Sequence, residues 1–211
     1  MNRVVDASGD PPPRHAVDRA VGALGAGGVV VVPTDTVYGL AVAATQPGAT
    51  EGLFALKQRP VHVALPVLVA NLDQALALAA DESLVVARRL MERFWPGAVT
   101  LVVPRRPGLG LDLGGPDDLT VGLRLPDHPV PVALAAAAGP LAVTSANRHG
   151  RPTPTALADV LAQLGAGVEV ALDAGPLEGR ASTVVSCAAD GVRVLREGAV
   201  PAAEVLAAAR L

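Results

Sequence analysis

The sequence predicts a single α/β domain in which helices cover a mixed sheet. Apolar, β-branched runs alternate irregularly with segments of helical spacing, and some of the strand-like runs follow one another directly. Apolar residues make up 51% of the chain, enough for a substantial core. Because the sequence shows no internal repeat and no Pro/Ser-rich linker, we expect one domain.

The first part of the chain has an expected tail, a helix and a strand. Three consecutive prolines in residues 1–13 block helix and ladder bonding, so we expect a flexible tail there and a domain over 14–211. Helical spacing of apolar residues predicts a helix over 14–24. Four valines at 29–32 predict a strand buried on both faces.

A polar turn follows that strand. Pro33 ends it, and Thr34, Asp35 and Thr36 lie at its carboxyl end, the edge where open α/β sheets usually bind ligands. Gly39 would allow backbone or ligand to come close.

The remaining elements follow from periodicity and from Gly and Pro positions. Further helices are expected over 47–57, 72–80, 81–94, 131–138, 155–164 and 201–210. Further strands are expected over 65–69, 99–103, 119–125, 141–144, 168–172, 182–186 and 192–195. Pro66 indicates an edge strand or a bulge. The Gly/Pro-rich segment 104–118 is long enough for a lid or binding loop.

Composition excludes several classes of protein. A net charge of −3 and 2% aromatic residues argue against a general nucleic-acid coat. One cysteine, Cys187, excludes an internal disulfide, and the sequence has no Cys/His cluster of zinc spacing. No apolar run approaches about 18 residues, so we expect an unexported, cytoplasmic protein without a membrane span.

Small hydroxyls and cations at the ends of elements are the candidate site residues. The chain lacks a phosphate-binding P-loop, a G-x-S-x-G elbow and an H-E-x-x-H motif. Lys57, the only lysine, lies with Arg59 at a helix end, where two cations suit phosphate oxygens or merely favour the helix C-terminus. Thr120 and Arg124 share one strand face, and Arg124 needs an anionic partner, either a substrate carboxylate or an internal Asp such as Asp173.

The motif T-S-A-N at 144–147 follows an apolar strand. Ser145 and Asn147 could leave the sheet at the same edge as Thr36, or could form a turn that satisfies only the backbone. Ser182 and Arg196 lie near further strand ends, so several strand ends are expected to converge on one polar cleft.

Seven motifs together resemble the YrdC-like threonylcarbamoyl-AMP synthase family. In order and with family-like spacing, they are P-T-D-T-V-Y-G-L (33–40), K-Q-R-P (57–60), F-W-P-G-A-V-T (94–100), V-G-L-R (121–124), T-S-A-N (144–147), S-T-V-V (182–185) and L-R-E-G (195–198). The resemblance covers roughly residues 15 to 200. It implies an open twisted sheet around a basic concave pocket.

The resemblance also implies a reaction. L-threonine, bicarbonate or CO2, and ATP would give threonylcarbamoyl-AMP and pyrophosphate, which makes the protein a nucleotidyltransferase. The product would pass to the tRNA-modifying threonylcarbamoyl transferase machinery, and a weak tRNA contact is a further expectation. Mg²⁺ would accompany ATP, held mainly by substrate oxygens and water.

Site residues follow from the resemblance by position. The expected threonine contacts are Thr36, Arg124, Val143 through its backbone, and Ser182. The expected ATP contacts are Lys57, Arg59, Thr120, Ser145, Asn147, Thr153 and Arg196, with Lys57 and Arg59 also expected to act in catalysis. Asp35 would contact the water shell of the Mg²⁺ ion.

The chain departs from the family pattern in two places. Longer members carry an Asn and a His where this chain has Val63 and Leu68, as shorter bacterial members do. The chain also stops soon after L-R-E-G, so we expect the extra C-terminal domain of longer members to be absent.

Two other functions remain open. One is binding of structured tRNA or rRNA, for example in ribosome maturation, against which net charge and scarce aromatics argue. The other is carbamoyl transfer to a different acceptor through a carbamoyl adenylate.

Overall fold

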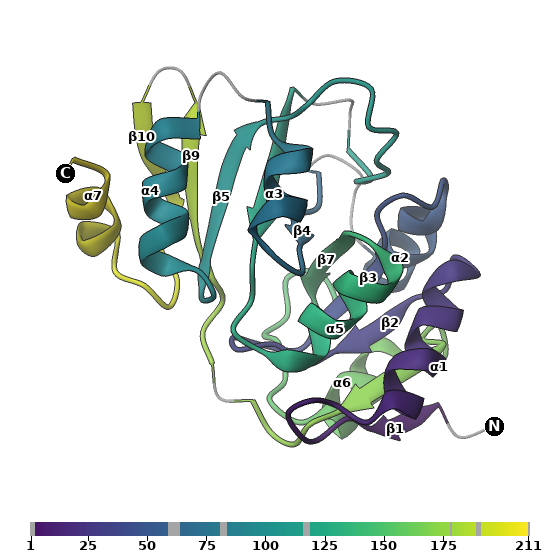
Figure 1. Ribbon diagram of the computed structural model, residues 1–211. Helices are drawn as coiled ribbons and strands as arrows, with labels where there is room; N and C mark the ends of the chain where they lie inside the picture. The colour runs from purple at the N-terminus through teal and green to yellow at the C-terminus, as the bar shows by residue number, and fades with distance from the viewer. Residues whose placement is uncertain are drawn as a thin grey trace.

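A mixed sheet runs through the whole molecule (Figure 1). The computed structural model describes residues 3–58, 64–80, 84–115, 119–177, 179–188 and 191–210. Within them the strands are β1 Val4–Asp6, β2 Val30–Val32, β3 Gly39–Ala43, β4 Val67–Leu68, β5 Val99–Pro104, β6 Thr120–Arg124, β7 Leu141–Ser145, β8 Val170–Asp173, β9 Thr183–Ala188 and β10 Gly191–Arg196. The helices in the same residues are α1 Arg14–Gly25, α2 Ala49–Lys57, α3 Leu72–Leu78, α4 Leu84–Phe94, α5 Pro129–Ala138, α6 Leu157–Leu164 and α7 Ala202–Arg210.

The strand order is β1-β8-β2-β3-β7-β4-β6-β5-β9-β10. The sheet contains both parallel pairs (β1–β8, β2–β8, β4–β6 and β5–β9) and antiparallel pairs, so the mixed sheet predicted from the irregular order of strands and helices is confirmed. The two chain ends lie at opposite ends of the sheet, beside β1 and β10 (Figure 1).

Helices cover the two faces of the sheet unequally. On one face α1 and α5 pack against alternate residues of β1, β8, β2, β3 and β7, and they form the smaller core. On the other face α2, α3, α4, α6 and α7 contribute to a larger core. Both cores consist almost wholly of Val, Leu and Ala, as a composition with 2% aromatic residues requires.

The sheet face covered by α1 and α5 carries apolar side chains in one half of the sheet and polar side chains in the other. The polar half carries the site. Leu101 of β5 and Leu123 of β6 are paired and point into the larger core. Their strand neighbours Thr100 and Arg124 therefore point to the face of α1 and α5, beyond the part those helices cover. That face is apolar from β1 to β4, and it carries the polar residues Arg124, Thr100 and Ser186 on β6, β5 and β9.

The prediction of a tail over residues 1–13 is wrong for Val4–Asp6. These residues form β1 and pair in parallel with β8, and Val5 and Ala7 are buried. The prolines begin only at Pro11, after the strand, and β8 offers an edge with which the N-terminal valines can pair. The domain therefore begins before residue 14.

The interpretation of Pro66 as an edge marker is also wrong. β4 is only Val67–Leu68 and lies between β7 and β6 inside the sheet. The proline is tolerated because it precedes the strand. Sequence reasoning also missed β3, because Gly39–Ala43 follows the polar turn directly and is too short for a clear period-2 pattern.

The predicted loop over 104–118 is confirmed in its described part, although Pro104 itself belongs to β5. Residues 105–115, together with Ala64 and Leu119, line a hollow of about 450 Å³. A second hollow of about 560 Å³ lies between Gly110–Gly115 and the start of α2. Residues 116–118, and the helix start expected at 81–83, lie outside the described residues. Among the described helices none is long and apolar enough to cross a bilayer.

Candidate functional site

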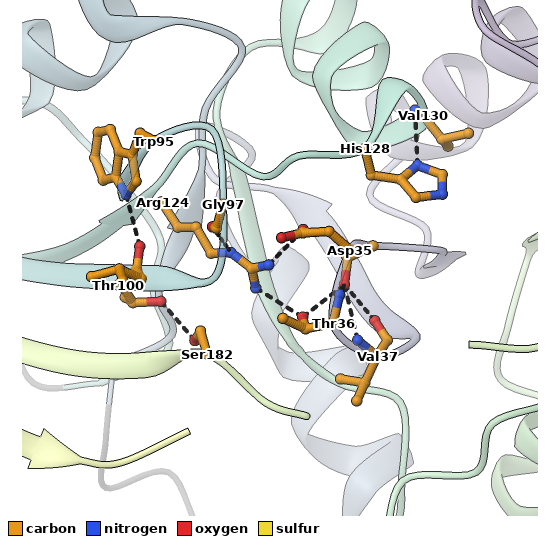
Figure 2. Close-up of polar contacts among 12 residues, drawn as sticks. Asp35, Thr36, Val37, Trp95, Gly97, Thr100, Arg124, His128, Val130 and Ser182 are labelled. Carbon is orange, nitrogen blue, oxygen red and sulfur yellow. Dashed lines mark hydrogen bonds and ion pairs between the residues drawn. The ribbon is translucent and has the colours of Figure 1, made fainter. Parts of the chain in front are cut away.

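Arg124, the last residue of β6, organises the first polar cluster (Figure 2). Its Nε donates to the carbonyl of Gly97 at 2.9 Å, and its Nη1 donates to Thr36 Oγ1 at 3.0 Å. Its Nη2 forms a 2.5 Å ion pair with Asp35 Oδ1. Arg124 is only 6% exposed, and its guanidinium is thus held in a fixed orientation at the carboxyl end of β6.

The turn that carries Asp35 and Thr36 is shaped by Thr34. The Thr34 hydroxyl donates to the carbonyl of Val37 at 2.6 Å and accepts from the backbone N–H groups of Thr36 and Val37. It also lies 2.9 Å from Thr36 Oγ1. This local bonding is typical of Thr after a strand-ending proline, and it aims the Thr36 hydroxyl at Arg124.

Ser182 and Arg196 belong to the same cluster. Ser182 Oγ lies 2.9 Å from Thr100 Oγ1, and Arg196 Nη2 donates to the Ser182 carbonyl at 2.8 Å. Burial and then the positive charge of Arg124 lower the pKa of Arg196. The cluster therefore contains two neighbouring guanidinium groups and one carboxylate, that of Asp35. Its net charge is positive.

Of the two partners expected for Arg124, the structure shows an internal Asp, but this residue is Asp35 and not Asp173. Asp173 Oδ1 instead accepts from the Tyr38 hydroxyl at 3.2 Å and from the Gly175 N–H at 3.0 Å. The Tyr38 hydroxyl also donates to the Gly175 carbonyl at 2.6 Å, and burial raises the pKa of Tyr38 to about 12. The buried ring of Tyr38 thereby fixes the start of the segment that leads to Ser182.

That segment crosses directly over the Thr36 turn. A Cβ at Gly179 would overlap the Thr36 backbone, and a Cβ at Gly198 would overlap the backbone of Ala181 and Ser182. Only glycine at position 179 lets its segment pack this closely on the Thr36 turn. Only glycine at position 198 lets the chain after β10 pack on Ala181 and Ser182. The close approach expected at Gly39 is confirmed as well, since a Cβ there would lie 2.8 Å from a methyl group of Val143.

Lys57 organises a second polar cluster. It ends α2 and is only 2% exposed. Its Nζ donates to the Ser145 carbonyl at 2.5 Å, to the Asn147 carbonyl at 2.7 Å and to Asn147 Oδ1 at 3.2 Å. The Lys57 carbonyl in turn accepts from the His149 N–H at 3.0 Å. Lys57 therefore shapes the loop after β7, and the nucleotide contact predicted for it stays a prediction.

Asn147 is the centre of that loop. Its Oδ1 also accepts from Ser145 Oγ at 2.5 Å and from Thr153 Oγ1 at 3.4 Å. Its Nδ2 donates to the carbonyls of Arg148 and Arg151. The structure therefore brings together Lys57, Ser145, Asn147 and Thr153, as the cleft interpretation predicted, and it also shows the turn-forming role of the alternative.

The two clusters meet where β3 begins. Ser145 is paired with Gly39, three residues after Thr36, and the Ala146 N–H donates to the Tyr38 carbonyl at 2.8 Å. Thr120 and Arg124 share the polar face of β6 as predicted. Val143 lies on β7, two residues before Ser145. The predicted convergence is thus confirmed for Thr36, Arg124, Ser182 and Arg196 in one cluster and for Lys57, Ser145, Asn147 and Thr153 in the other, whereas Thr120 lies at the opposite end of β6 from Arg124.

Some predicted features lie away from the two clusters or outside the described residues. Arg59 and Val63 lie outside the described residues, and Leu68 is buried in the smaller core. The two hollows beside the 105–115 loop include none of the predicted site residues. Within the described chain, no group of three or more His, Cys, Asp and Glu side chains is arranged to hold a metal ion.

Sequence reasoning assigned no role to Thr100, Tyr38 or Gly179, although Thr100 and Tyr38 lie within the quoted motifs. Thr100 is a polar residue in an otherwise apolar strand, which is a signal that could have been used. Tyr38 is the only tyrosine of the chain and follows the polar turn directly. Nothing local marks Gly179, because its requirement comes from a turn about 140 residues earlier in the chain.

This arrangement suits the binding of anions. Two neighbouring arginines are held together with the hydroxyl groups of Thr36 and Ser182, so this cluster can orient anionic ligands and neutralise part of their charge. The fold and the site together define an α/β protein in which the polar half of a mixed sheet suits small anionic ligands.

The chain belongs to the Sua5/YciO/YrdC family, whose model carries the description "telomere recombination" and matches residues 22–198. A putative threonylcarbamoyl-AMP synthase of Mycobacterium tuberculosis is 43% identical over 195 residues, which are 90% of this chain and 88% of that protein. The threonylcarbamoyl-AMP synthase of Bacillus subtilis is 39% identical over 82% of this chain and 50% of its own length.

Solved structures agree with this assignment. The crystal structure of Pyrococcus abyssi Sua5 complexed with L-threonine matches with a TM-score of 0.87 and 30% identity, over 97% of this chain and 60% of that one. Escherichia coli YciO matches with a TM-score of 0.79 and 26% identity, over 94% and 95% of the two chains. The chain thus spans nearly all of the mycobacterial relative and of YciO, and about half to three fifths of the longer proteins.

Proposed function

We propose that this protein is an L-threonylcarbamoyladenylate synthase, a nucleotidyltransferase that makes threonylcarbamoyl-AMP and pyrophosphate from L-threonine, bicarbonate or CO2, and ATP. The observation that carries the proposal is the Arg124 cluster, in which a buried guanidinium is anchored by Gly97, Thr36 and Asp35 beside a second arginine. Relatives named threonylcarbamoyl-AMP synthase, and the threonine complex of a structural neighbour, support it.

In this proposal the first cluster holds the amino acid. The planar fork of Arg124 binds the threonine carboxylate, with Thr36 and Ser182 supplying hydroxyl groups nearby. The amine takes up CO2 to form a carbamate. A carbamate oxygen then attacks the α-phosphorus of ATP, an N–COO–P linkage forms, and the bond to the departing pyrophosphate breaks.

The second cluster and Arg196 hold the nucleotide. Lys57 keeps the 145–153 loop in place, so that Ser145 and Thr153 can meet the phosphates, and Arg196 lies next to Arg124 where the two substrates meet. Carbamate and triphosphate are both anionic and repel each other. Holding them in line between fixed cations therefore lowers the barrier, and positioning of this kind can supply about 7 to 11 kcal/mol.

The position of Mg²⁺ and the protein that receives the product are part of the same proposal. Asp35 is the acidic residue nearest the cluster, and its Oδ1 is bound to Arg124, so the described residues offer no acidic cage. We therefore assign Mg²⁺ to the ATP phosphates and water, where it would neutralise phosphate charge. The product would pass to a tRNA-modifying transferase in the cytoplasm. The matches give no support to the alternative of an RNA-binding factor.

The test supplies the purified protein with ATP, Mg²⁺, bicarbonate and each of the twenty amino acids in turn. We expect pyrophosphate release and an aminoacyl-carbamoyl adenylate, detected by mass spectrometry, with L-threonine. Removal of bicarbonate should abolish both. Product with a different amino acid only, or no product at all, contradicts the proposal.

A pair of arginine variants ties the activity to the cluster. Arg124→Gln should raise the KM for threonine at least tenfold, because it removes a charge-assisted contact that contributes about 1.5 to 3 kcal/mol. Arg93→Gln is the matched control, since Arg93 pairs with Glu204 on the exposed surface. Its KM should equal that of the wild type.

A further inference from the structure

Thr100 lies between two residues of the Arg124 cluster. The paired residues Leu101 and Leu123 fix the register of β5 and β6, so Thr100 stands opposite Arg124 on the polar face. On its other side Thr100 faces the start of β9, and its Oγ1 is 2.9 Å from Ser182 Oγ (Figure 2). Its hydroxyl is almost fully buried and therefore needs a partner within the protein.

The two branches of the Thr100 side chain point to different strands. Its methyl group lies on the side of β6, 3.5 Å from the position that a Cβ at Gly122 would take. Its hydroxyl lies on the side of β9, where it meets Ser182. A β-branched side chain has few χ1 rotamers, so packing of the methyl group beside Gly122 keeps the hydroxyl directed at Ser182.

The hydroxyl groups of Thr100 and Ser182 have one hydrogen more than their bonds use. Each hydroxyl has one hydrogen to donate and two lone pairs that accept. The bond between the two groups uses one of the two hydrogens. The other neighbour of Ser182 Oγ is Arg196 Nη2 at 3.5 Å, which can only donate. The side-chain hydrogen bonds of the described residues therefore give the second hydrogen no acceptor.

Burial and rotamer freedom decide which hydroxyl keeps the unused hydrogen. Thr100 is 3% exposed and lies within β5, whereas Ser182 is 8% exposed, precedes β9 and is not β-branched. A buried hydroxyl hydrogen without an acceptor is costly, so Thr100 donates to Ser182 Oγ. Ser182 then accepts from Thr100 and Arg196 and has only its hydrogen to offer. A ligand atom beside Ser182 must therefore be an acceptor.

The backbone around Ser182 is held without Thr100. The Thr183 N–H donates to the Ala98 carbonyl at 3.0 Å, and Arg196 Nη2 donates to the Ser182 carbonyl at 2.8 Å. Loss of the Thr100 hydroxyl should therefore change the direction of the Ser182 hydrogen and leave the position of Ser182 unchanged.

We propose that Thr100 is a positioning residue for the amino-acid substrate, because it donates to Ser182 Oγ and leaves the Ser182 hydrogen for a carboxylate oxygen. The inference rests on the proposed function and deepens it. Thr100 acts through Ser182 and not on the substrate directly. By making Ser182 a donor only, it favours the carboxylate that Arg124 is proposed to bind and disfavours an ammonium group in the same place.

The test removes the Thr100 hydroxyl and then restores it. Thr100→Val keeps the shape of the side chain and should raise the KM for threonine about fivefold, within the range of one neutral hydrogen bond. The kcat should stay within about twofold, because a contact made equally in the bound substrate and in the transition state changes KM alone. Thr100→Ser should return the KM to within about twofold of the wild type.

A double-mutant cycle shows whether Thr100 acts through Ser182. Ser182→Ala removes the donor itself and should raise the KM for threonine about tenfold. When Thr100→Val is added to Ser182→Ala, the KM should rise no further. An additional rise as large as that of Thr100→Val alone would show that the two residues act independently, and it would overturn the inference.

Thr50→Val is the matched control for the loss of a buried threonine hydroxyl. Thr50 is as buried as Thr100, lies at the opposite end of α2 from Lys57, and donates through Oγ1 to Asp112 Oδ1 at 2.6 Å. This variant should lose at least as much stability as Thr100→Val, because it breaks a bond to a carboxylate, and it should keep the KM of the wild type. An equal rise of the KM in both variants would remove the role of Thr100.

Binding without turnover separates this inference from the proposed function. Calorimetric titration of L-threonine into the protein gives a Kd without ATP or bicarbonate. If Thr100→Val binds threonine more weakly than the wild type and Thr100→Ser recovers the affinity, the role of Thr100 stands even where the wild type makes no adenylate, and only the proposed function fails. Equal affinity of Thr100→Val and the wild type overturns the role of Thr100, even where the wild type makes the adenylate.

Discussion

At the scale of single residues, Asp35 and Arg124 form an ion pair where a substrate carboxylate is proposed to bind. The side chains of Arg124 and Asp35 are 7% and 14% exposed, so their attraction is only partly screened. Gly97 and Thr36 anchor the guanidinium independently of Asp35. Asp35 therefore both steadies Arg124 and repels an incoming carboxylate.

Asp35→Asn should separate these two effects. Removing the negative charge should lower the KM for threonine several-fold, while the loss of a charged partner for a buried arginine should lower the free energy of unfolding by roughly 1–3 kcal/mol. Steady-state kinetics and urea titration measure the two. A raised KM would mean that Asp35 serves the substrate only by orienting Arg124.

Lys57 shows how far residue-level prediction reached. Its uniqueness in the sequence singled it out correctly as a residue of the polar region. Its three bonds to Ser145 and Asn147 could not be foreseen, because those acceptors lie about 90 residues further along the chain. The partner of Arg124 was likewise undecidable from composition, since any acidic residue could have served.

At the scale of elements, His128 at the start of α5 should make the stability of the fold depend on pH. Its Nδ1 accepts from the Val130 N–H at 3.2 Å, as the side chain of an N-cap residue does. Nδ1 therefore carries no proton in the folded protein. Burial lowers the pKa of His128 from 6.5, against the smaller opposing effects of Asp35, Asp127 and Asp10.

The unfolded chain therefore binds more protons than the folded one just below pH 6.5, and stability should fall as the pH drops from 6.5 toward the lower folded pKa. His128→Asn keeps a capping acceptor without a titrating group and should remove this contribution. Urea titrations of both proteins between pH 7.5 and 5 provide the measurement. Equal pH dependence in the two proteins would exclude His128 as the source.

At the scale of the whole molecule, one sheet joins the two polar clusters. The larger core receives residues from α2 and α6 at one end and from α4 and α7 at the other, so no seam divides the described chain into halves. Tyr38 and the glycines at 179 and 198 bind distant segments across the sheet. The molecule should therefore unfold cooperatively.

The single tryptophan makes this testable. Trp95 lies beside β5, where its Nε1 donates to the Val99 carbonyl at 2.7 Å, and it reports on that end of the sheet only. Its fluorescence and the far-UV circular dichroism of the whole chain should give the same urea midpoint. Midpoints that differ reproducibly would show that the β5 end unfolds separately.

The sequence by itself determined the fold class, most helices and strands, and the motifs that supply the site. These depend on local periodicity, on prolines and glycines, and on polar residues at strand ends, all of which act within a few residues. Only the tertiary structure decided that Val4–Asp6 is a strand, that Pro66 lies inside the sheet, and that Asp35 rather than Asp173 pairs with Arg124. Each depends on which distant strand lies alongside, and strand pairing and burial are settled by the whole chain.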